Sequence, residues 1–208
     1  MSREIDVFPE RKVDLGKQIV IFIGPEGSGK TSIAKRLAAE SGTPYIATGD
    51  ILRDMAKNDK TEYGDACRAM LAEHRYLESK TLLAILVKRF SQDDLKEGFI
   101  LDGGLRTVGE TEGFQSVLEK ADRIMPITAV FLRIPGWMSF QRLMSEKNLR
   151  KREDDTVEGI LNRLSNYYNQ LGRRADLIKK QKDWRLLHIN AMGNIEDVFN
   201  DVRAKIAK

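Results

Sequence analysis

The feature that most constrains the fold is an uninterrupted apolar run that ends in a glycine-rich loop. The run Ile19 to Ile23 stops at Gly24, and the loop GPEGSGKT, residues 24–31, follows it. Apolar side chains then recur at Ile33 and Leu37, at the spacing of one helix face. A strand without polar alternation is buried on both faces, as strands of helix-covered parallel sheets are. The pattern therefore predicts a strand, a tight loop and a helix.

Strand-like and helix-like segments alternate along the rest of the chain. Short apolar runs predict further strands at 44–47, 99–101, 127–132 and 186–189. Helical spacing predicts helices at 51–55, 63–74, 79–91, 140–144, from 156 to a break near Gly172, and from 195, with Asn194 as the N-cap of the last. Such alternation predicts an α/β protein with three layers, a parallel sheet covered on both faces, and ligands at the carboxyl ends of the strands.

Composition excludes several classes of protein. The chain has 208 residues, of which 41% are hydrophobic, and 35 Lys and Arg against 31 Asp and Glu, a formal net charge of +4. This supplies the core of one domain, and no apolar run approaches the roughly 20 residues of a membrane-spanning helix. The single cysteine, Cys67, can form neither an intrachain disulfide nor a thiolate zinc site. The small positive excess fits polyphosphate ligands as well as nucleic acid.

The first 18 residues are polar and contain four acidic side chains, Glu4, Asp6, Glu10 and Asp14. Neither a secretory signal nor an arginine-rich transit peptide has this composition. We therefore expect a cytoplasmic protein with an N-terminal extension at 1–18.

The glycine-rich loop matches the phosphate-binding pattern G-x4-G-K-[ST]. Small residues let successive backbone N–H groups curve around phosphate oxygens at a helix N-terminus, and Lys30 supplies a mobile cation. A chance glycine-rich turn is the alternative. The predicted strand before the loop and helix after it favour phosphate binding.

Four further segments, in order along the chain, resemble the adenylate kinase family of nucleoside monophosphate kinases. They are TGDILR at 48–53, GFILDGGLRT at 98–107, Arg142, and Arg152-Glu153-Asp154-Asp155 with Arg163 eleven residues after Arg152. The resemblance covers residue 19 to about 206. The interval from Arg142 to Arg152 is too short for a long lid and is similar to the short-lid form. This implies a P-loop NTPase-type kinase domain at 19–208, with an NMP-binding insertion at about 48–91 and a short lid at about 145–155.

The resemblance also implies roles for single residues. ATP would lie on Gly24, Pro25, Glu26, Gly27, Ser28, Gly29, Lys30, Thr31, Ser32, Arg142 and Met192. The acceptor monophosphate would lie on Thr48, Gly49, Arg53, Gly103, Arg106, Glu110, Arg152 and Arg163. Catalysis would fall to Lys30, Arg106, Arg152 and Arg163, while Asp102 and Thr31 would hold Mg²⁺, directly or through water. No structural zinc, nucleic acid or membrane partner is implied, and a monomer is expected.

Arginines suit this chemistry for a physical reason. Phosphoryl transfer between two nucleotides needs two polyanions held in line and the transferring charge neutralised, with little covalent participation by the protein. Arginine forks pair with phosphate oxygens in a bidentate manner and keep their charge at neutral pH.

The chain departs from the family pattern at several positions. Gly104-Leu105 replaces the usual Phe-Pro before Arg106, so the proline that fixes the backbone is absent. Glu110 replaces a glutamine that reads the acceptor base, and a carboxylate, which only accepts hydrogen bonds, would suit the guanine edge. Glu26 puts a negative charge in the phosphate loop, where it resembles thymidylate kinases, and Glu146 replaces a frequent arginine, with Lys147 beside it as a substitute.

Three functions follow as hypotheses. The first is an adenylate kinase that converts ATP and AMP to two ADP, which Thr48 favours because it resembles the adenylate branch. The second is a kinase of another monophosphate: GMP, CMP, UMP or dTMP. The third is a nucleotide-binding module with degenerate transfer activity, against which the set of acceptor arginines argues.

Overall fold

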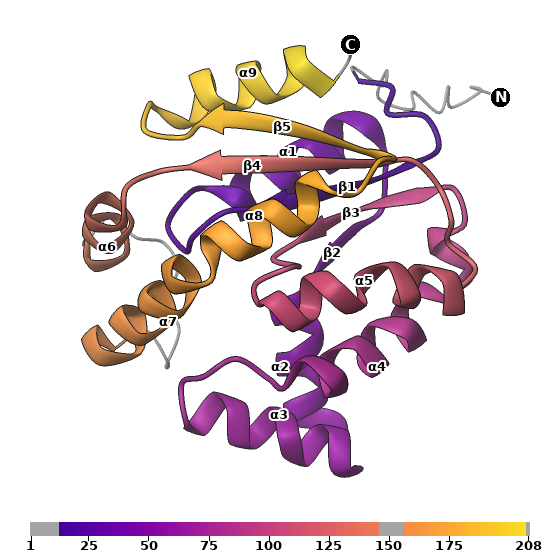
Figure 1. Cartoon of the computed structure of the whole chain (residues 1–208), viewed down its shortest axis with the longest axis vertical. Helices are drawn as coiled ribbons and strands as arrows, with labels where there is room; N and C mark the ends of the chain where they lie inside the picture. The colour runs from indigo at the N-terminus through magenta and orange to yellow at the C-terminus, as the bar shows by residue number, and fades with distance from the viewer. Residues whose placement is uncertain (1–12, 146–155, 207–208) are drawn as a thin grey trace, which may run out of the picture.

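The computed structural model describes residues 13–145 and 156–206 (Figure 1). Its sheet has five parallel strands in the order β2-β3-β1-β4-β5. The strands are β1 Gln18–Ile23, β2 Tyr45–Ala47, β3 Gly98–Asp102, β4 Ile127–Arg133 and β5 Trp184–Asn190. The predicted α/β fold with a parallel sheet is confirmed, and every expected strand lies within one to three residues of its predicted bounds.

Helices connect the strands and cover the sheet. They are α1 Lys30–Ser41, α2 Thr48–Asn58, α3 Glu62–Ala72, α4 Ser79–Phe90, α5 Val108–Lys120, α6 Gly136–Met144, α7 Val157–Asn169, α8 Leu171–Lys179 and α9 Ile195–Ile206, with a short 3-10 helix η1 at Asp93–Leu95. Helices α2 and α3 extend below the sheet in Figure 1. They form, with α4, the region in which the sequence placed the NMP-binding insertion.

Two details of the helices differ from the sequence-based prediction. The break expected near Gly172 lies at Gln170, and Gly172 is inside α8. Helix α5 was not predicted, although its start carries a sequence signal. The Thr107 hydroxyl accepts a hydrogen bond from the Glu110 amide at 3.1 Å, which is half of a Thr-x-x-Glu capping box.

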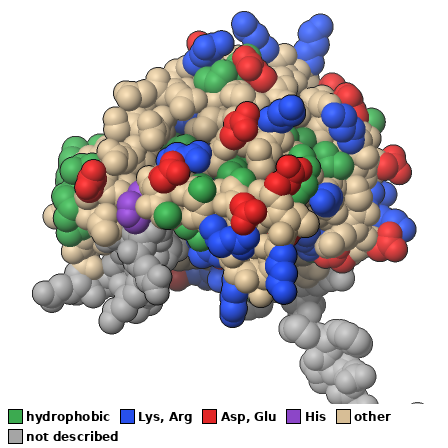
Figure 2. Space-filling view, turned by 90° about the horizontal axis from the view of Figure 1, so that it is seen from below, with side chains coloured by type: hydrophobic (Ala, Val, Ile, Leu, Met, Phe, Trp, Pro, Cys, Tyr) green, Lys and Arg blue, Asp and Glu red, His purple; other side chains and the backbone are tan. Residues whose placement is uncertain are grey.

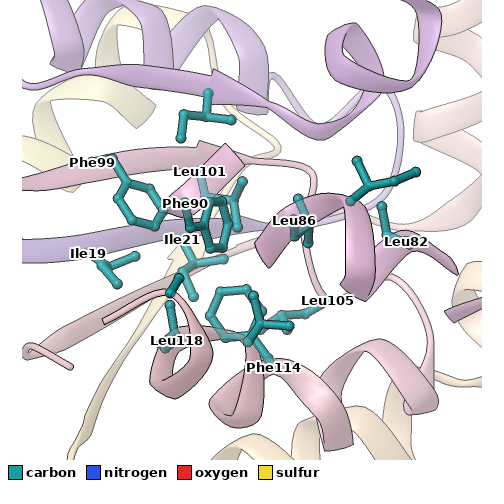
Figure 3. Close-up of a cluster of buried hydrophobic side chains, with 14 of the residues drawn as sticks. Ile19, Ile21, Leu82, Leu86, Phe90, Phe99, Leu101, Leu105, Phe114 and Leu118 are labelled. Atoms are coloured by element: carbon teal, nitrogen blue, oxygen red, sulfur yellow. The ribbon is translucent and has the colours of Figure 1, made fainter. Parts of the chain in front are cut away.

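The alternating side chains of β1 divide the core into two clusters, one on each face of the sheet. Ile19 and Ile21 point into a cluster with residues of α4 and α5, among them Phe90 and Phe114 (Figure 3). Val20 and Phe22 point the other way, into a cluster with residues of α1 and α9. All four β1 side chains are fully buried. This explains why the strand reads as a continuous apolar run.

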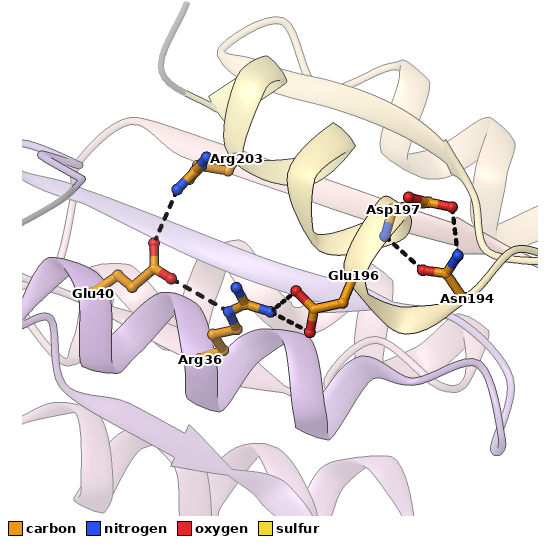
Figure 4. A network of polar contacts seen from close by, with 6 residues as sticks. All are labelled: Arg36, Glu40, Asn194, Glu196, Asp197 and Arg203. Carbon is orange, nitrogen blue, oxygen red and sulfur yellow. Dashed lines mark hydrogen bonds and ion pairs between the residues drawn. The ribbon is translucent and has the colours of Figure 1, made fainter.

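Polar contacts join α1 to α9 at the surface (Figure 4). Arg36 of α1 donates to both carboxylate oxygens of Glu196 at 2.7 Å, and Glu40 lies between Arg36 and Arg203. Asn194 accepts from the Asp197 amide at 2.9 Å, which confirms it as the N-cap of α9. Exposed ion pairs contribute little stability each. The network joins α9 to α1, whose N-terminus follows the glycine-rich loop.

The packed chain begins before β1. Val13 and Leu15, which the sequence assigned to the extension at 1–18, are buried in the α1–α9 cluster, and the Val13 amide donates to the Glu40 carbonyl. Within the described ranges, no helix is both long and apolar enough to cross a membrane. On the face seen from below, acidic and basic side chains are interspersed (Figure 2).

Candidate active site

The strand register brings three segments to one edge of the sheet. Phe22 pairs with Asp102 at the end of β1, and Asp102 also pairs with Ala47, the last residue of β2. The glycine-rich loop follows β1, while Thr48 follows β2 directly. From β1 the chain continues to β2 and β3 on one side of β1 and then to β4 and β5 on the other. Ligands bind at the carboxyl ends of strands near such a switch.

Two glycines of the loop have conformations that other residues rarely adopt. Gly27 has φ +77° and Gly29 has φ +89°. A Cβ added to Gly27 would lie 2.8 Å from the Ser139 carbonyl oxygen of α6. The first turn of α1, residues 30–33, contains no acidic side chain. The loop therefore presents backbone N–H groups and a helix N-terminus that favour an anion.

Lys30 folds back onto the loop. Its Nζ donates to the carbonyls of Gly24 at 2.8 Å and Pro25 at 2.7 Å. Both acceptors are neutral, so a charged phosphate oxygen can compete for the ammonium group. The Ser28 hydroxyl is buried and has no hydrogen-bond partner among the described residues. Contact of both groups with the phosphates of ATP stays a prediction.

Asp102 forms a small oxygen cluster at the end of β3. Its side chain is buried, with 6% of the residue exposed, and Oδ2 accepts from the Thr31 hydroxyl at 2.6 Å and from the Tyr45 hydroxyl at 2.9 Å. Burial and the Asp102 charge raise the pKa of Tyr45, so Tyr45 stays a donor. Carboxylate and hydroxyl oxygens are the ligands that Mg²⁺ prefers. Within residues 13–145 and 156–206, no three or more His, Cys, Asp or Glu side chains are grouped so that they could hold a metal ion. Most ligands of such an ion would therefore be nucleotide oxygens or water.

Arg142 joins the glycine-rich loop to the segment after β5. Its guanidinium donates to the carbonyls of Ala191 at 3.0 Å and Met192 at 3.1 Å, with longer bonds to Gly193 and Gly27. The Met192 side chain is exposed. The structure thus brings together Arg142, Met192 and the loop, three parts of the predicted ATP site that are far apart in the sequence.

Arg163 of α7 also contacts the loop. Its Nε donates to Glu26 Oε2 at 3.1 Å, and both side chains are largely buried. The two residues are 137 positions apart, and the sequence predicted a role for each without pairing them. An arginine of the predicted acceptor set therefore lies against the predicted ATP loop.

Arg106 lies on an aromatic ring that sequence reasoning missed. Its guanidinium carbon is 5.3 Å from the ring centre of Tyr76, whose hydroxyl donates to the Arg163 carbonyl at 3.4 Å. Burial raises the pKa of Tyr76 to about 12. Tyr76 lies in the connector between α3 and α4, and no local pattern marks it. It links the two predicted acceptor arginines.

Glu110 is buried at the start of α5. Its Oε2 accepts from the Arg106 amide at 2.8 Å. Burial raises the pKa of Glu110 more than the neighbouring Arg106 guanidinium lowers it. Its contact with the base of an acceptor stays a prediction, and in this structure the carboxylate orients the backbone of Arg106.

The remaining acceptor residues lie on α2 and after β3. Arg53 pairs with Asp50 one turn earlier, and no described contact joins it to Arg106 or Arg163. Gly49 faces the Arg53 guanidinium, since a Cβ there would lie 3.2 Å from both terminal nitrogens. Thr48 is fully buried, and its hydroxyl has no hydrogen-bond partner among the described residues. Gly103, with φ +81°, begins the turn to Arg106.

Arg152, and with it Glu146 and Lys147, lies outside the described residues, as does most of the predicted lid. The bridging role of Arg152 stays a prediction.

A strand, a phosphate loop and a helix, with arginines from separate elements around the loop, define a P-loop phosphotransferase. Comparison with known proteins specifies the class further. The adenylate kinase family model matches residues 22–182, so the chain belongs to the adenylate kinase family. Its transfer reaction accordingly uses a phosphate group as acceptor.

The chain aligns with individual relatives over nearly their whole length. The chain is 35% identical to an adenylate kinase of Mycobacterium sp. (strain MCS) over 86% of this chain and 94% of the relative. It is 32% identical to one of Cyanothece sp. (strain PCC 7425) over 90% and 92%, and 29% identical to one of Methanosarcina mazei over 91% and 98%.

Proposed function

We propose that this nucleoside monophosphate kinase uses AMP as acceptor and converts ATP and AMP to two molecules of ADP. The observation that carries the proposal is the chain of contacts from the loop to the acceptor side: Glu26 to Arg163, and Arg163 through Tyr76 to Arg106. These contacts run from Glu26 in the loop to two of the arginines proposed to hold the acceptor, which supports the proposal. A protein that only binds ATP has no need of these arginines.

In this mechanism an oxygen of the AMP phosphate attacks the γ-phosphorus of ATP in line. The bond from that phosphorus to the oxygen bridging it to the β-phosphate breaks, so ATP leaves as ADP and AMP becomes ADP. Lys30 moves from the loop carbonyls to the β- and γ-phosphates, Arg106 holds the acceptor phosphate, and Arg163 lies between the two. These cations stabilise the transferring group without a covalent intermediate.

Asp102 and Thr31 are the residues that would hold Mg²⁺, directly or through water. The buried Asp102 carboxylate and the exposed Thr31 hydroxyl, 2.6 Å apart, fit an ion with hard oxygen ligands. When bound with ATP, the ion neutralises charge on the phosphate oxygens. Asp102, at the end of β3, would set the position of the bound ion relative to Lys30.

Adenine is the acceptor base that the site favours. The unpartnered hydroxyl of Thr48 is buried where β2 ends, and a ring nitrogen or an amino group can satisfy it. The carboxylate that would suit guanine, on Glu110, already accepts from the Arg106 amide. Guanine also has ring nitrogens and an amino group, so the occupied carboxylate of Glu110 is the observation that supports AMP over GMP.

A coupled assay of ATP with AMP, GMP, CMP, UMP and dTMP tests the proposal. We expect the highest kcat/KM with AMP and a requirement for Mg²⁺. Turnover of dTMP alone, or of GMP in preference to AMP, contradicts the choice of acceptor. Absence of ADP formation above background with all five contradicts kinase activity itself.

The assembly and location stay predictions from the sequence: a cytoplasmic monomer without a nucleic-acid or membrane partner. Light scattering of the purified chain, with and without ATP, measures the oligomeric state directly. A mass near 23.7 kDa is the expected result.

A further inference from the structure

The turn that carries Arg106 has an uncommon backbone. Leu105 adopts φ +56°, in the left-handed region that residues with a side chain rarely occupy. Its side chain is buried in the cluster beneath α4 and α5 (Figure 3). Glycines at 103 and 104 precede it and add backbone freedom. A turn of this composition does not hold its own shape, so other parts of the chain must fix it.

Arg174 of α8 supplies such a contact. It is 1% exposed, and its two terminal nitrogens donate to the Leu105 carbonyl at 2.6 Å and the Tyr167 carbonyl at 3.0 Å. Its guanidinium also lies over the Tyr167 ring, 4.3 Å from the ring centre. The planar fork thus ties the turn before Arg106 to the last part of α7, the helix that carries Arg163.

A buried guanidinium contributes little net stability to the fold. Desolvating a charge opposes folding, and Arg174 has no ion-pair partner within the described chain. Its Nε makes no hydrogen bond there either. What the side chain does provide is geometry, because one rigid guanidinium bonds two carbonyls from separate segments.

A second contact from the same junction holds the other side of Arg106. Gln170, between α7 and α8, accepts from the Val108 amide at 2.9 Å. Arg106 therefore lies between two residues, Leu105 and Val108, that are both fixed by the α7–α8 junction. The Glu110 carboxylate holds the Arg106 amide between them.

We propose that Arg174 is a positioning residue for Arg106: it holds the Leu105 turn so that the Arg106 guanidinium meets the acceptor phosphate. The inference rests on the proposed role of Arg106. Arg174 lies in the buried core and touches neither nucleotide. Its effect should appear in the use of the acceptor and leave the binding of ATP unchanged.

The test uses the full chain with Arg174→Met, which removes the fork, and Arg174→Lys, which keeps the charge. The matched control is Arg173→Met, next in sequence but 74% exposed and 3.8 Å from Glu112. For Arg174→Met we expect kcat/KM for AMP to fall by about a hundredfold, as a small misplacement of a catalytic group can cause. The Kd for ATP should stay within about twofold, Arg174→Lys should recover part of the loss, and the control should match the wild type.

A double-mutant cycle with Arg106→Ala separates positioning from general damage. If Arg174 acts through Arg106, Arg174→Met adds little to the loss that Arg106→Ala already causes. An additional loss of the same size in both backgrounds, or equal losses in ATP binding and AMP use, overturns the proposal. If Arg174→Met does not fold, the cycle is run with Arg174→Lys, where the same outcomes decide.

Amide hydrogen exchange distinguishes failure of this inference from failure of the proposed function. Arg174→Met should speed exchange at the Arg106 and Val108 amides more than at amides of β1, whether or not AMP is the acceptor. Uniform acceleration, or none, contradicts positioning. An unchanged AMP rate in Arg106→Ala instead contradicts the role of Arg106, and the inference fails with it.

Discussion

The proposed ATP side and the proposed acceptor side of this site would hold phosphate by different means. On the ATP side the backbone itself forms the cradle, with Gly27 and Gly29 at positive φ between a buried strand and a helix anchored to α9. On the proposed acceptor side the phosphate would meet arginine side chains: Arg106 in a turn, Arg53 on α2 and Arg163 on α7. Arg106 contacts Tyr76 and Glu110, and the turn before it contacts Arg174, so the contacts around Arg106 come from three other segments.

The two halves of the site are therefore sensitive to different substitutions. A backbone cradle fails when a local conformation or close approach is altered, and a side chain grafted onto a glycine suffices. A site built from arginine side chains loses phosphate binding when a remote contact that positions an arginine is removed, even if the substituted residue does not contact the ligand. Four substitutions test this contrast, beginning with the one that should affect activity most.

Arg106→Ala tests the acceptor side directly. We expect kcat/KM for AMP to fall by about a hundred- to a thousandfold, as for loss of a transition-state donor, with ATP affinity within about twofold of wild type. Steady-state kinetics and calorimetric ATP titration measure the two quantities. Arg89→Ala, which removes an arginine paired with Asp94 at the surface of α4, serves as control. Equal losses in both measurements contradict the assignment.

Gly27→Ala tests the ATP side. Its Cβ would meet the Ser139 carbonyl oxygen at 2.8 Å. We expect ATP affinity to fall by at least about tenfold, which corresponds to about 1.4 kcal/mol. Gly16→Ala is a matched control, because Gly16 has φ +61° but a Cβ there has nothing within 4 Å. It incurs the backbone strain without the overlap. If both variants bind ATP alike, close approach to α6 does not shape the loop.

Glu26→Gln tests the contact between the two sides. The Glu26 carboxylate pairs with Arg163 and lies in the loop that receives a polyanion. Removing its charge should raise ATP affinity by about threefold, because electrostatic complementarity to the phosphates improves. Glu196→Gln, which breaks a surface pair with Arg36, is the control. Weaker ATP binding by Glu26→Gln would mean that Glu26 orients Arg163 productively rather than competing with phosphate.

Glu110→Gln gives the smallest effect, seen in stability against pH. Burial raises the pKa of Glu110 above the ordinary value of 4.5, so the folded chain binds this proton more tightly than the unfolded chain. The free energy of unfolding of the wild type should therefore fall, relative to Glu110→Gln, as pH rises from about 4.5 towards neutrality. Urea unfolding at several pH values measures the difference. A difference that is constant, or that grows in favour of the wild type, contradicts the raised pKa.

The same contrast governs how much the sequence reveals. The strand, the glycines and Lys30 of the ATP side are contiguous, and the local pattern predicts their arrangement. The acceptor side is assembled from distant residues: Glu26 and Arg163 are 137 positions apart, and Arg174 is 69 positions from Leu105. A buried arginine looks like a surface one in the sequence. Nothing about leucine predicts a left-handed turn, and only the Thr107-x-x-Glu110 pattern hints at α5.

In the proposed mechanism the phosphoryl group passes directly from ATP to AMP at one edge of the sheet. The most direct measurement uses ATP labelled in its γ-phosphate with unlabelled AMP and Mg²⁺, followed by separation of the nucleotides during the first turnovers. The account predicts label in the β-phosphate of ADP formed from AMP, in amounts equal to the ATP consumed. Label released as inorganic phosphate, or retained in ATP while AMP is unchanged, would contradict it.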